Sequence, residues 1–354
     1  MERFLIDVAE RSIRSEIIIG RGFPEPLLPD RPTRDRTVIM TQSAAGDVAT
    51  RVSDHLRGAP IFFCPEGEEA KTLMAAGKAY EWLGEMGLSR HDTLIGVGGG
   101  AVTDATGFIG GTWQRGVETV LIPTTLLGAV DAAIGGKTAL NLGGKNQVGV
   151  FHLPVRVVID LDVVEELAPA LLIEGRAEAI KAGLIGDAGL VRLFDELGPE
   201  AALDEVVPRA VAVKVAVVNG DYRDEGARAV LNFGHTVGHA VEVLTPLGHG
   251  SAVAVGMMAA GGLSALRYGF DLEWLRGLLV RNELPVAAPG LSASAVLELV
   301  HRDKKRLGTE IRMVLLRDVA DPVIESVSEA ELLMGLGTIG IGPGNLTDFH
   351  SVSS

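Results

Sequence analysis

Three histidines are grouped in the second half of the chain. His235 and His239 are spaced i, i+4 on an expected helix and His249 follows a short loop, so three of the eight histidines fall within fifteen positions. Imidazole is a common zinc ligand, and catalytic zinc sites combine three protein ligands with one open position. A single histidine is more often a core residue, but this grouping predicts a metal site. Spacing alone nominates His235 and His239 first, by analogy with His-Glu-x-x-His helices.

An acid and a base precede the histidines on another expected helix. Glu178 and Lys181 are three residues apart and therefore share a helix face. An exposed ion pair would contribute less than about 1 kcal/mol. The neighbours Ala177 and Ile180 are small or apolar, however, which favours a pair that points into a cleft. Glu178 is thus a helix-borne carboxylate that is available to a metal site formed by the histidines.

A glycine turn lies between an expected strand and an expected helix. Gly98, Gly99 and Gly100 allow the backbone to approach a pyrophosphate closely, and the helix N-terminus adds N–H groups that lack partners. The turn is not the usual Gly-x-Gly-x-x-Gly fingerprint. A dinucleotide site and a simple tight turn are both consistent with it.

A second glycine-rich stretch carries lysines. Gly135-Gly-Lys-Thr138 is not a phosphate-binding Walker A loop, because Asp131 stands where that motif requires its first glycine. Lys137, Lys145 and Asn146 remain in a loop between strands. Solvated loop lysines are the plain alternative, but the glycine-rich setting favours a ligand site.

The overall charge makes these cationic groups informative. The formal net charge is −14, so the chain lacks the basic footprint of a nucleic-acid-binding protein. An anionic ligand would need locally concentrated cations, and Lys214, Arg228 and Asp303-Lys-Lys305 add to that supply. The single Cys64, the absence of a secretory apolar run and the absence of an uncharged apolar span predict a cytoplasmic protein without a membrane span.

The expected elements divide the chain into two parts. Apolar runs at 37–40, 61–64, 93–97, 120–123 and 157–160 alternate with helical patterns, which predicts a parallel α/β sheet. Helical segments then dominate, at 173–184, 201–218, 236–244 and 251–267, before a strand at 312–316. We therefore expect an α/β domain over 1–168 and a mainly α-helical domain over 169–354.

The ordered motifs resemble the 3-dehydroquinate synthase family of sugar-phosphate cyclases, from about residue 37 to about residue 330. They are Gly67-Glu68-x-x-Lys71, Gly98-Gly-Gly-x-x-x-Asp104, Arg115-Gly, Pro123-Thr-Thr125, Asp131, Gly135-Gly-Lys-Thr138, Gly144-Lys-Asn146, Ala177-Glu-x-x-Lys181, Lys214, Arg228, Asn232-Phe-Gly-His235-Thr-x-Gly-His239, His249-Gly and Asp303-Lys-Lys305. The resemblance implies a Rossmann-like NAD-binding domain followed by a mainly α-helical metal-binding domain. It also implies a homodimer.

The resemblance assigns roles that spacing leaves open. The implied ligands of Zn²⁺ (or Co²⁺) are Glu178, His235 and His249, whereas His239, Lys181 and Asn232 would be catalytic. The implied substrate ligands are Arg115 (from a partner subunit), Asp131, Lys137, Asn146, Lys181, Lys214, Arg228, Asn232, His239, Lys304 and Lys305. The implied NAD ligands are Glu68, Lys71, Gly98, Gly99, Gly100, Val102, Asp104, Thr124, Thr125, Asp131, Lys137 and Lys145.

The implied activity is a lyase reaction of the shikimate pathway. It converts 3-deoxy-D-arabino-heptulosonate 7-phosphate into 3-dehydroquinate and phosphate, and NAD ends as it began. The sequence departs from the family pattern at Ser251, where His-Gly-Glu is usual, and around Pro169 and Asp221. An amino-dehydroquinate synthase therefore stays open as an alternative. A glycerol-dehydrogenase-type oxidoreductase is less favoured, because it would not need so many phosphate- and carboxylate-binding groups. An inactive paralogue is less favoured too, because the set Glu178, His235, His249, Lys181 and Arg228 is complete.

Overall fold

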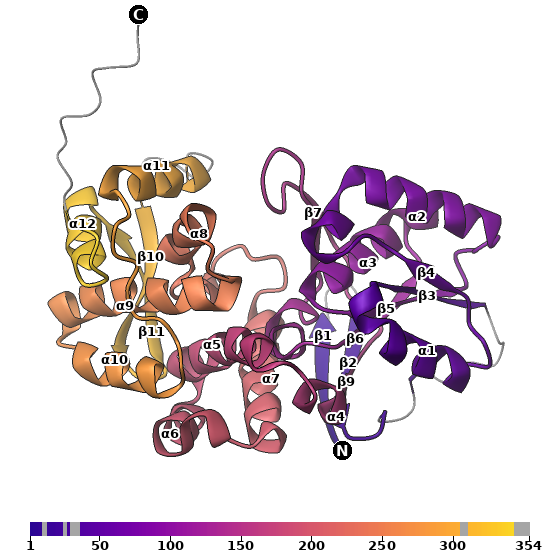
Figure 1. Cartoon of the computed structure of the whole chain (residues 1–354), viewed down its shortest axis with the longest axis horizontal. Helices are drawn as coiled ribbons and strands as arrows, with labels where there is room; N and C mark the ends of the chain where they lie inside the picture. The colour runs from indigo at the N-terminus through magenta and orange to yellow at the C-terminus, as the bar shows by residue number, and fades with distance from the viewer. Residues whose placement is uncertain (9–12, 24–26, 29–35, 305–310, 343–354) are drawn as a thin grey trace, which may run out of the picture. The chain divides into compact units, whose positions relative to one another are not determined.

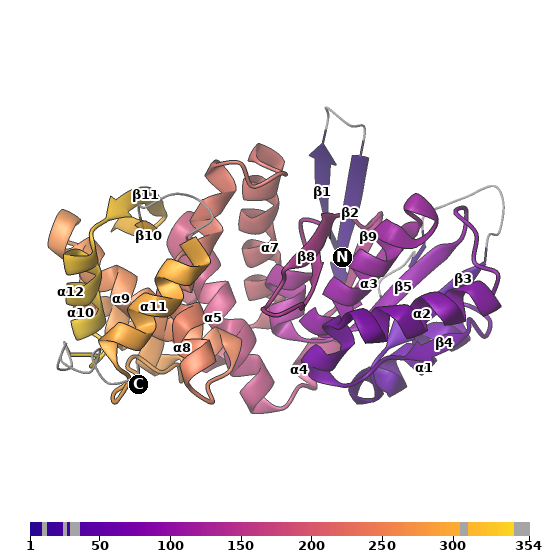
Figure 2. The same cartoon turned by 90° about the horizontal axis from the view of Figure 1, so that it is seen from above.

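The computed structural model describes residues 1–8, 13–23, 27–28, 36–304 and 311–342 (Figures 1 and 2). The chain forms two compact units. Unit 1 comprises Met1–Gly175 with Leu203–Arg223, and unit 2 comprises Arg176–Ala202 with Asp224–Ser354. This division differs from the expected boundary after residue 168.

The difference arises from helix α7 (Leu203–Gly220), which the sequence places in the second domain. In the structure α7 packs against strand β1 (Glu2–Val8) and against a π-helical turn, η5 (Gly128–Ala132). The Asn219 side chain accepts a hydrogen bond from the Asp7 amide at 3.1 Å and donates one to the Leu5 carbonyl at 3.2 Å. These long-range contacts, which periodicity cannot reveal, assign α7 to unit 1.

Unit 1 is built on a seven-stranded sheet of order β1-β2-β9-β6-β5-β3-β4. Only β1 and β2 pair antiparallel, and the other neighbours are parallel. The strands are β2 (Ile13–Gly20), β3 (Thr37–Thr41), β4 (Ile61–Phe63), β5 (Thr93–Gly98), β6 (Glu118–Pro123) and β9 (Arg156–Asp160). Their near-continuous apolar runs are typical of strands covered on both faces. The five predicted strands are confirmed, whereas β1, β2 and a small hairpin, β7 (Lys137–Leu140) with β8 (Val148–Phe151), were not predicted.

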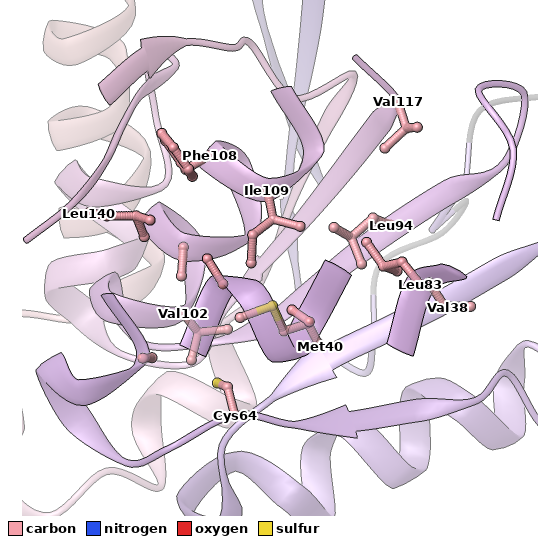
Figure 3. Close-up of a cluster of buried hydrophobic side chains, with 14 of the residues drawn as sticks. Val38, Met40, Cys64, Leu83, Leu94, Val102, Phe108, Ile109, Val117 and Leu140 are labelled. Carbon is pink, nitrogen blue, oxygen red and sulfur yellow. The ribbon is translucent and has the colours of Figure 1, made fainter. Parts of the chain in front are cut away.

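Besides α7, four α-helices lie wholly within the described part of unit 1. They are α1 (Gly46–His55), α2 (Leu73–Glu85), α3 (Gly100–Thr112) and α4 (Leu161–Glu165). Figure 3 shows Val102 and Ile109 of α3 beside Met40 and Leu94 of the sheet, in one apolar cluster. Because α3 packs between β5 and β7, its glycine at position 107 would place a Cβ only 2.3 Å from a Thr138 methyl group.

Unit 2 is mainly helical, as predicted, and α9 (His249–Tyr268) is its central helix (Figure 1). Around it lie α8 (His235–Leu244), α10 (Leu272–Arg281), α12 (Glu329–Gly337) and the hairpin β10 (Ile311–Asp318) with β11 (Asp321–Val327). The remaining helices are α5 (Pro169–Gly186), which starts in unit 1, α6 (Ala188–Leu197) and α11 (Ala293–Lys304). By length and composition alone α9 could cross a membrane, but 78% of that stretch is buried, as expected of a core helix.

Helices α8 and α9 approach each other through glycines. A Cβ at position 256 of α9 would lie 1.9 Å from the Gly234 carbonyl oxygen and 2.7 Å from the Gly238 nitrogen. Gly234 itself has a φ of +78°, a conformation that favours glycine, and immediately precedes His235. The glycines therefore set the spacing of the two helices that carry the histidines.

We expect Gly256→Ala to lower the free energy of unfolding by at least about 2 kcal/mol, because its methyl group meets backbone rather than a flexible side chain. Gly277→Ala in α10 is the matched control, since its Cβ meets no atom within 4 Å. Removing a helix-interior glycine there should stabilise by about 0.5–1 kcal/mol. Urea unfolding measures both variants, and equal effects would contradict the close-packing argument.

Candidate active site

The structure brings Glu178, His235 and His249 together in unit 2. One potential ligand atom from each lies within 4.8 Å of the others. Oε1 of Glu178 is 3.6 Å from Nε2 of His235 and 3.6 Å from Nε2 of His249. Glu178 comes from α5, whereas the two histidines are the first residues of α8 and α9. Three helices thus converge on one point.

The three residues suit a divalent transition metal. A tetrahedral zinc ion with bonds of about 2.0–2.1 Å holds its ligand atoms about 3.4 Å apart, near the observed 3.6 Å. The Glu178 side chain is fully buried, and neither of its oxygens accepts a hydrogen bond of normal geometry from a described residue. A buried carboxylate that lacks hydrogen-bond donors requires a nearby positive charge to stabilise it. One carboxylate and two imidazoles also form a donor set typical of catalytic zinc.

Ionisation within this group follows from burial and charge. Burial opposes a charge on Glu178, but Lys181 and both imidazoles outweigh it and hold the pKa of the carboxyl well below its ordinary value. Burial lowers the pKa of His235 to about 3, with Lys181 acting in the same direction. Burial acts against the charge on His249 as well, yet the carboxylates of Glu178 and Glu242 raise its pKa to about 10. The carboxylate thus draws a proton onto one imidazole, where a metal ion would supply the positive charge instead.

Other predicted site residues surround this group in unit 2. Lys181 forms an ion pair with Oε2 of Glu178, so Oε1 is the oxygen that faces the imidazoles. The His239 ring centroid lies 5.2 Å from that of His235 and 6.0 Å from that of His249. His239 is exposed and does not belong to the three-residue group that the structure brings together, which therefore differs from the pair that spacing nominates. The Arg228 side chain is buried, whereas Asn232 is exposed.

Unit 1 holds the glycine turn predicted to bind NAD. The turn joins β5 to α3, and Gly99 is the N-cap of α3 with no side-chain hydrogen bond. A Cβ at Gly98 would lie 2.6 Å from Val102, and one at Gly99 would lie 3.2 Å from Thr125. The Thr124 amide donates to the Gly98 carbonyl at 3.0 Å. Because glycines form this turn, no side chain covers the backbone N–H groups at the start of α3, and an anion can approach them.

A buried lysine links several predicted site residues of unit 1. The Lys71 side chain, 5% exposed, donates to Oδ2 of Asp104 at 2.6 Å and to Oδ1 of Asn146 at 2.6 Å. Burial raises the pKa of Asp104 to about 6, although Lys71 acts against this rise. The resemblance places Lys71 and Asp104 with NAD and Asn146 with the substrate. In the structure all three form one polar cluster.

Sequence reasoning missed Asn141, which organises the same loop. Its side chain accepts from the Asn146 amide at 2.9 Å and donates to Oε2 of Glu68 at 2.8 Å. Asn146 has a φ of +53°, so this amide contact supports a left-handed backbone. The sequence signal was Asn141 five residues before Asn146 in a glycine-rich loop, but only the tertiary contact to Glu68 reveals its role.

Other predicted site residues of unit 1 are either ion-paired or exposed. Lys214 of α7 forms an ion pair with Asp131 of η5. Lys137 and Lys145 are exposed. Arg115 is exposed too, in a turn where Gln114 and Arg115 have φ of +51° and +66°. In unit 2, the Lys304 side chain and Lys305 lie outside the described residues.

The raised pKa of Asp104 predicts a pH-dependent effect of Asp104→Asn. Ionisation costs more in the folded chain than in the unfolded chain, so the stability that Asp104 contributes below about pH 4 is lost as the pH rises through about 6. The variant cannot ionise. The unfolding free energy of Asp104→Asn minus that of the original chain should therefore increase from pH 4 to pH 7, by up to about 3 kcal/mol.

Urea unfolding across this pH range measures the difference. The control is Asp54→Asn, which removes an exposed carboxylate from α1. A difference between Asp104→Asn and the original chain that does not change with pH would contradict the raised pKa.

Comparisons with known proteins agree with this architecture. Residues 61–174 match the sequence profile of the 3-dehydroquinate synthase N-terminal domain, and 175–306 match that of the C-terminal domain. The 3-dehydroquinate synthase of Corynebacterium jeikeium is 40% identical over 351 residues, which covers 92% of this chain and 94% of that protein.

Two solved structures are similar in fold. A 2-deoxy-scyllo-inosose synthase complexed with carbaglucose-6-phosphate, NAD+ and Co2+ has a TM-score of 0.84 at 23% identity, over 96% of this chain and 99% of the other. A 2-epi-5-epi-valiolone synthase from Streptomyces hygroscopicus, with NAD+ and Zn2+ bound, has a TM-score of 0.82 at 26% identity, over 91% and 96%. With this extent of similarity in sequence and fold, the chain belongs to the 3-dehydroquinate synthase family.

Proposed function

We propose that this chain is a 3-dehydroquinate synthase, a lyase that converts 3-deoxy-D-arabino-heptulosonate 7-phosphate into 3-dehydroquinate and phosphate. The observation that carries the proposal is the Glu178–His235–His249 group, with a buried carboxylate and two partly buried imidazoles, in a chain related to 3-dehydroquinate synthases over most of its length. An oxidoreductase that only exchanges hydride would not need the additional cationic groups Lys181 and Arg228 that are buried in the same unit.

In this proposal Glu178, His235 and His249 hold Zn²⁺ or Co²⁺, and the glycine turn at the start of α3 holds NAD. When bound, NAD accepts and returns a hydride, and the metal acts as a Lewis acid toward the substrate alcohol. Lys181 neutralises one oxygen of Glu178 and so directs the other oxygen toward the imidazoles. Lys181 and Arg228 give this part of an acidic chain the positive charge that an anionic substrate requires.

We assign proton transfer to His239. It is exposed, its ring is adjacent to those of both histidine ligands, and it shares a helix face with His235. An imidazole in this position can exchange a proton with substrate while the neighbouring histidines stay committed to the metal. Asn232 precedes α8 and is proposed to bind substrate hydroxyl groups.

In unit 1 the proposal assigns Asp131, Lys137, Asn146 and Lys214 to the substrate. The residues assigned to NAD are Glu68, Lys71, Gly98, Gly99, Gly100, Val102, Asp104, Thr124, Thr125 and Lys145, again with Asp131 and Lys137. The Lys71–Asp104 pair is consistent with neighbouring cofactor and substrate sites, because Lys71 holds a half-buried carboxylate beside the loop that carries Asn146. We further propose a cytoplasmic homodimer in which Arg115 reaches the substrate phosphate of the neighbouring protomer. Its exposed, left-handed turn is consistent with outward presentation. Lys304 or Lys305 is proposed to bind the same phosphate.

The direct test incubates the metal-loaded chain and NAD with the heptulosonate phosphate. We expect phosphate and dehydroquinate in equal amounts, with no net accumulation of NADH. NADH accumulation with a polyol and no phosphate release would indicate a glycerol-dehydrogenase-type enzyme. Turnover confined to an amino-substituted substrate would indicate an amino-dehydroquinate synthase.

We expect His249→Ala to weaken metal binding by more than about 100-fold, because loss of a ligand costs more than loss of a group that only orients one. Metal content after dialysis and competition with a chelator measure the effect. His55→Ala, at an exposed position of α1, is the control. Retained stoichiometric zinc in His249→Ala would show that the ligand assignment is wrong.

A further inference from the structure

A second carboxylate lies behind the histidine cluster. Oε2 of Glu242 is 3.2 Å from Nδ1 of His249, on the side of the ring opposite the nitrogen that faces Glu178. The Glu242 side chain is 15% exposed. An ionised carboxylate can only accept, so Nδ1 is the nitrogen that donates to Glu242, and a metal ion that displaces the proton on Nε2 would find the Nε2 lone pair directed at the centre of the cluster. The hydrogen bond therefore selects the tautomer that a metal ligand requires.

His235 reaches the same state in a different way. Its Nδ1 lies 3.2 Å from the backbone carbonyl oxygen of Phe233, so its Nε2 also faces Glu178. Both imidazoles thus have one nitrogen directed toward Glu178 and the other held by an oxygen. A backbone carbonyl two residues away is supplied by local geometry. The partner of His249 is a side chain seven residues away, and it can be removed by mutation.

His249 depends more on such a partner than His235 does. Its side chain is 29% exposed, against 12% for His235, so packing restrains its ring less. It is also the first residue of α9, after the loop that follows α8. Glu242 lies in the last turn of α8 and shares a face with His235 and His239, at spacings i, i+4 and i+7. The helix that provides one ligand therefore also orients the other.

We propose that Glu242 is a positioning residue of the metal site, which holds the His249 ring so that Nε2 is directed toward Glu178. This inference rests on the proposed metal site and assigns Glu242 a role within it. Groups that orient a metal ligand in this way typically change metal affinity about 10–100-fold when removed. Glu242 is not expected to touch the metal or the substrate.

Three variants test the role. Glu242→Leu removes the acceptor at similar volume, Glu242→Gln retains an acceptor oxygen, and Glu298→Gln removes an exposed carboxylate from α11 as a control. Affinity for Zn²⁺ and Co²⁺ is measured by competition with a chelator, and the absorption spectrum of bound Co²⁺ reports the ligand geometry. Urea unfolding confirms that each variant is folded. Glu242→Ala replaces the leucine variant if that variant does not fold.

We expect Glu242→Leu to lose about 10–100-fold in affinity and to change the Co²⁺ spectrum. Glu242→Gln should recover most of the affinity, and Glu298→Gln should match the original chain. Unchanged affinity and an unchanged Co²⁺ spectrum in Glu242→Leu would overturn the positioning role while leaving the metal site intact. If the original chain bound neither metal, the proposed metal site would fail, and this inference with it.

Discussion

The buried charge of Glu178 is the constraint on which the rest of unit 2 depends. A carboxylate with a fully buried side chain is costly unless positive charge compensates it. Lys181, one turn along the same helix, neutralises one oxygen. The other oxygen faces His235 and His249, which arrive from two further helices. The position of this charge therefore requires α5, α8 and α9 to meet, and in the proposed function a metal ion occupies their meeting point.

Close helix packing makes that meeting possible. Gly256 of α9 lies against the backbone of Gly234, one residue before His235, so no side chain separates the helices. The first residue of each helix then projects toward the same carboxylate. Glu242, at the other end of α8, contacts His249 from behind. The backbone contact between Gly256 and Gly234 and the side-chain contact between Glu242 and His249 thus both position the histidines.

Unit 1 also contains a buried charge, that of Lys71, and polar side chains compensate it. Lys71 is buried and contacts both Asp104 and Asn146, while Asn141 connects the Asn146 backbone to Glu68. The cluster therefore joins residues that the resemblance divides between cofactor and substrate. In an acidic chain, such local pairing keeps a cation where an anionic ligand needs it.

Much of the fold and of the metal group could be predicted from sequence, because both leave local patterns. Apolar runs identified six strands, and the α8 and α9 periodicity was clear, but β1 and β2 were not predicted. The expected boundary after residue 168 placed α7 in the second domain, whereas its contacts place it in unit 1. Motif resemblance selected Glu178, His235 and His249, whereas spacing alone favoured His239. The sequence by itself determined which residue types were available for chemistry. Only the tertiary structure decided which of them meet, because the approach of α5, α8 and α9 depends on contacts between residues far apart in the chain, as do the contacts of Glu242 and Asn141.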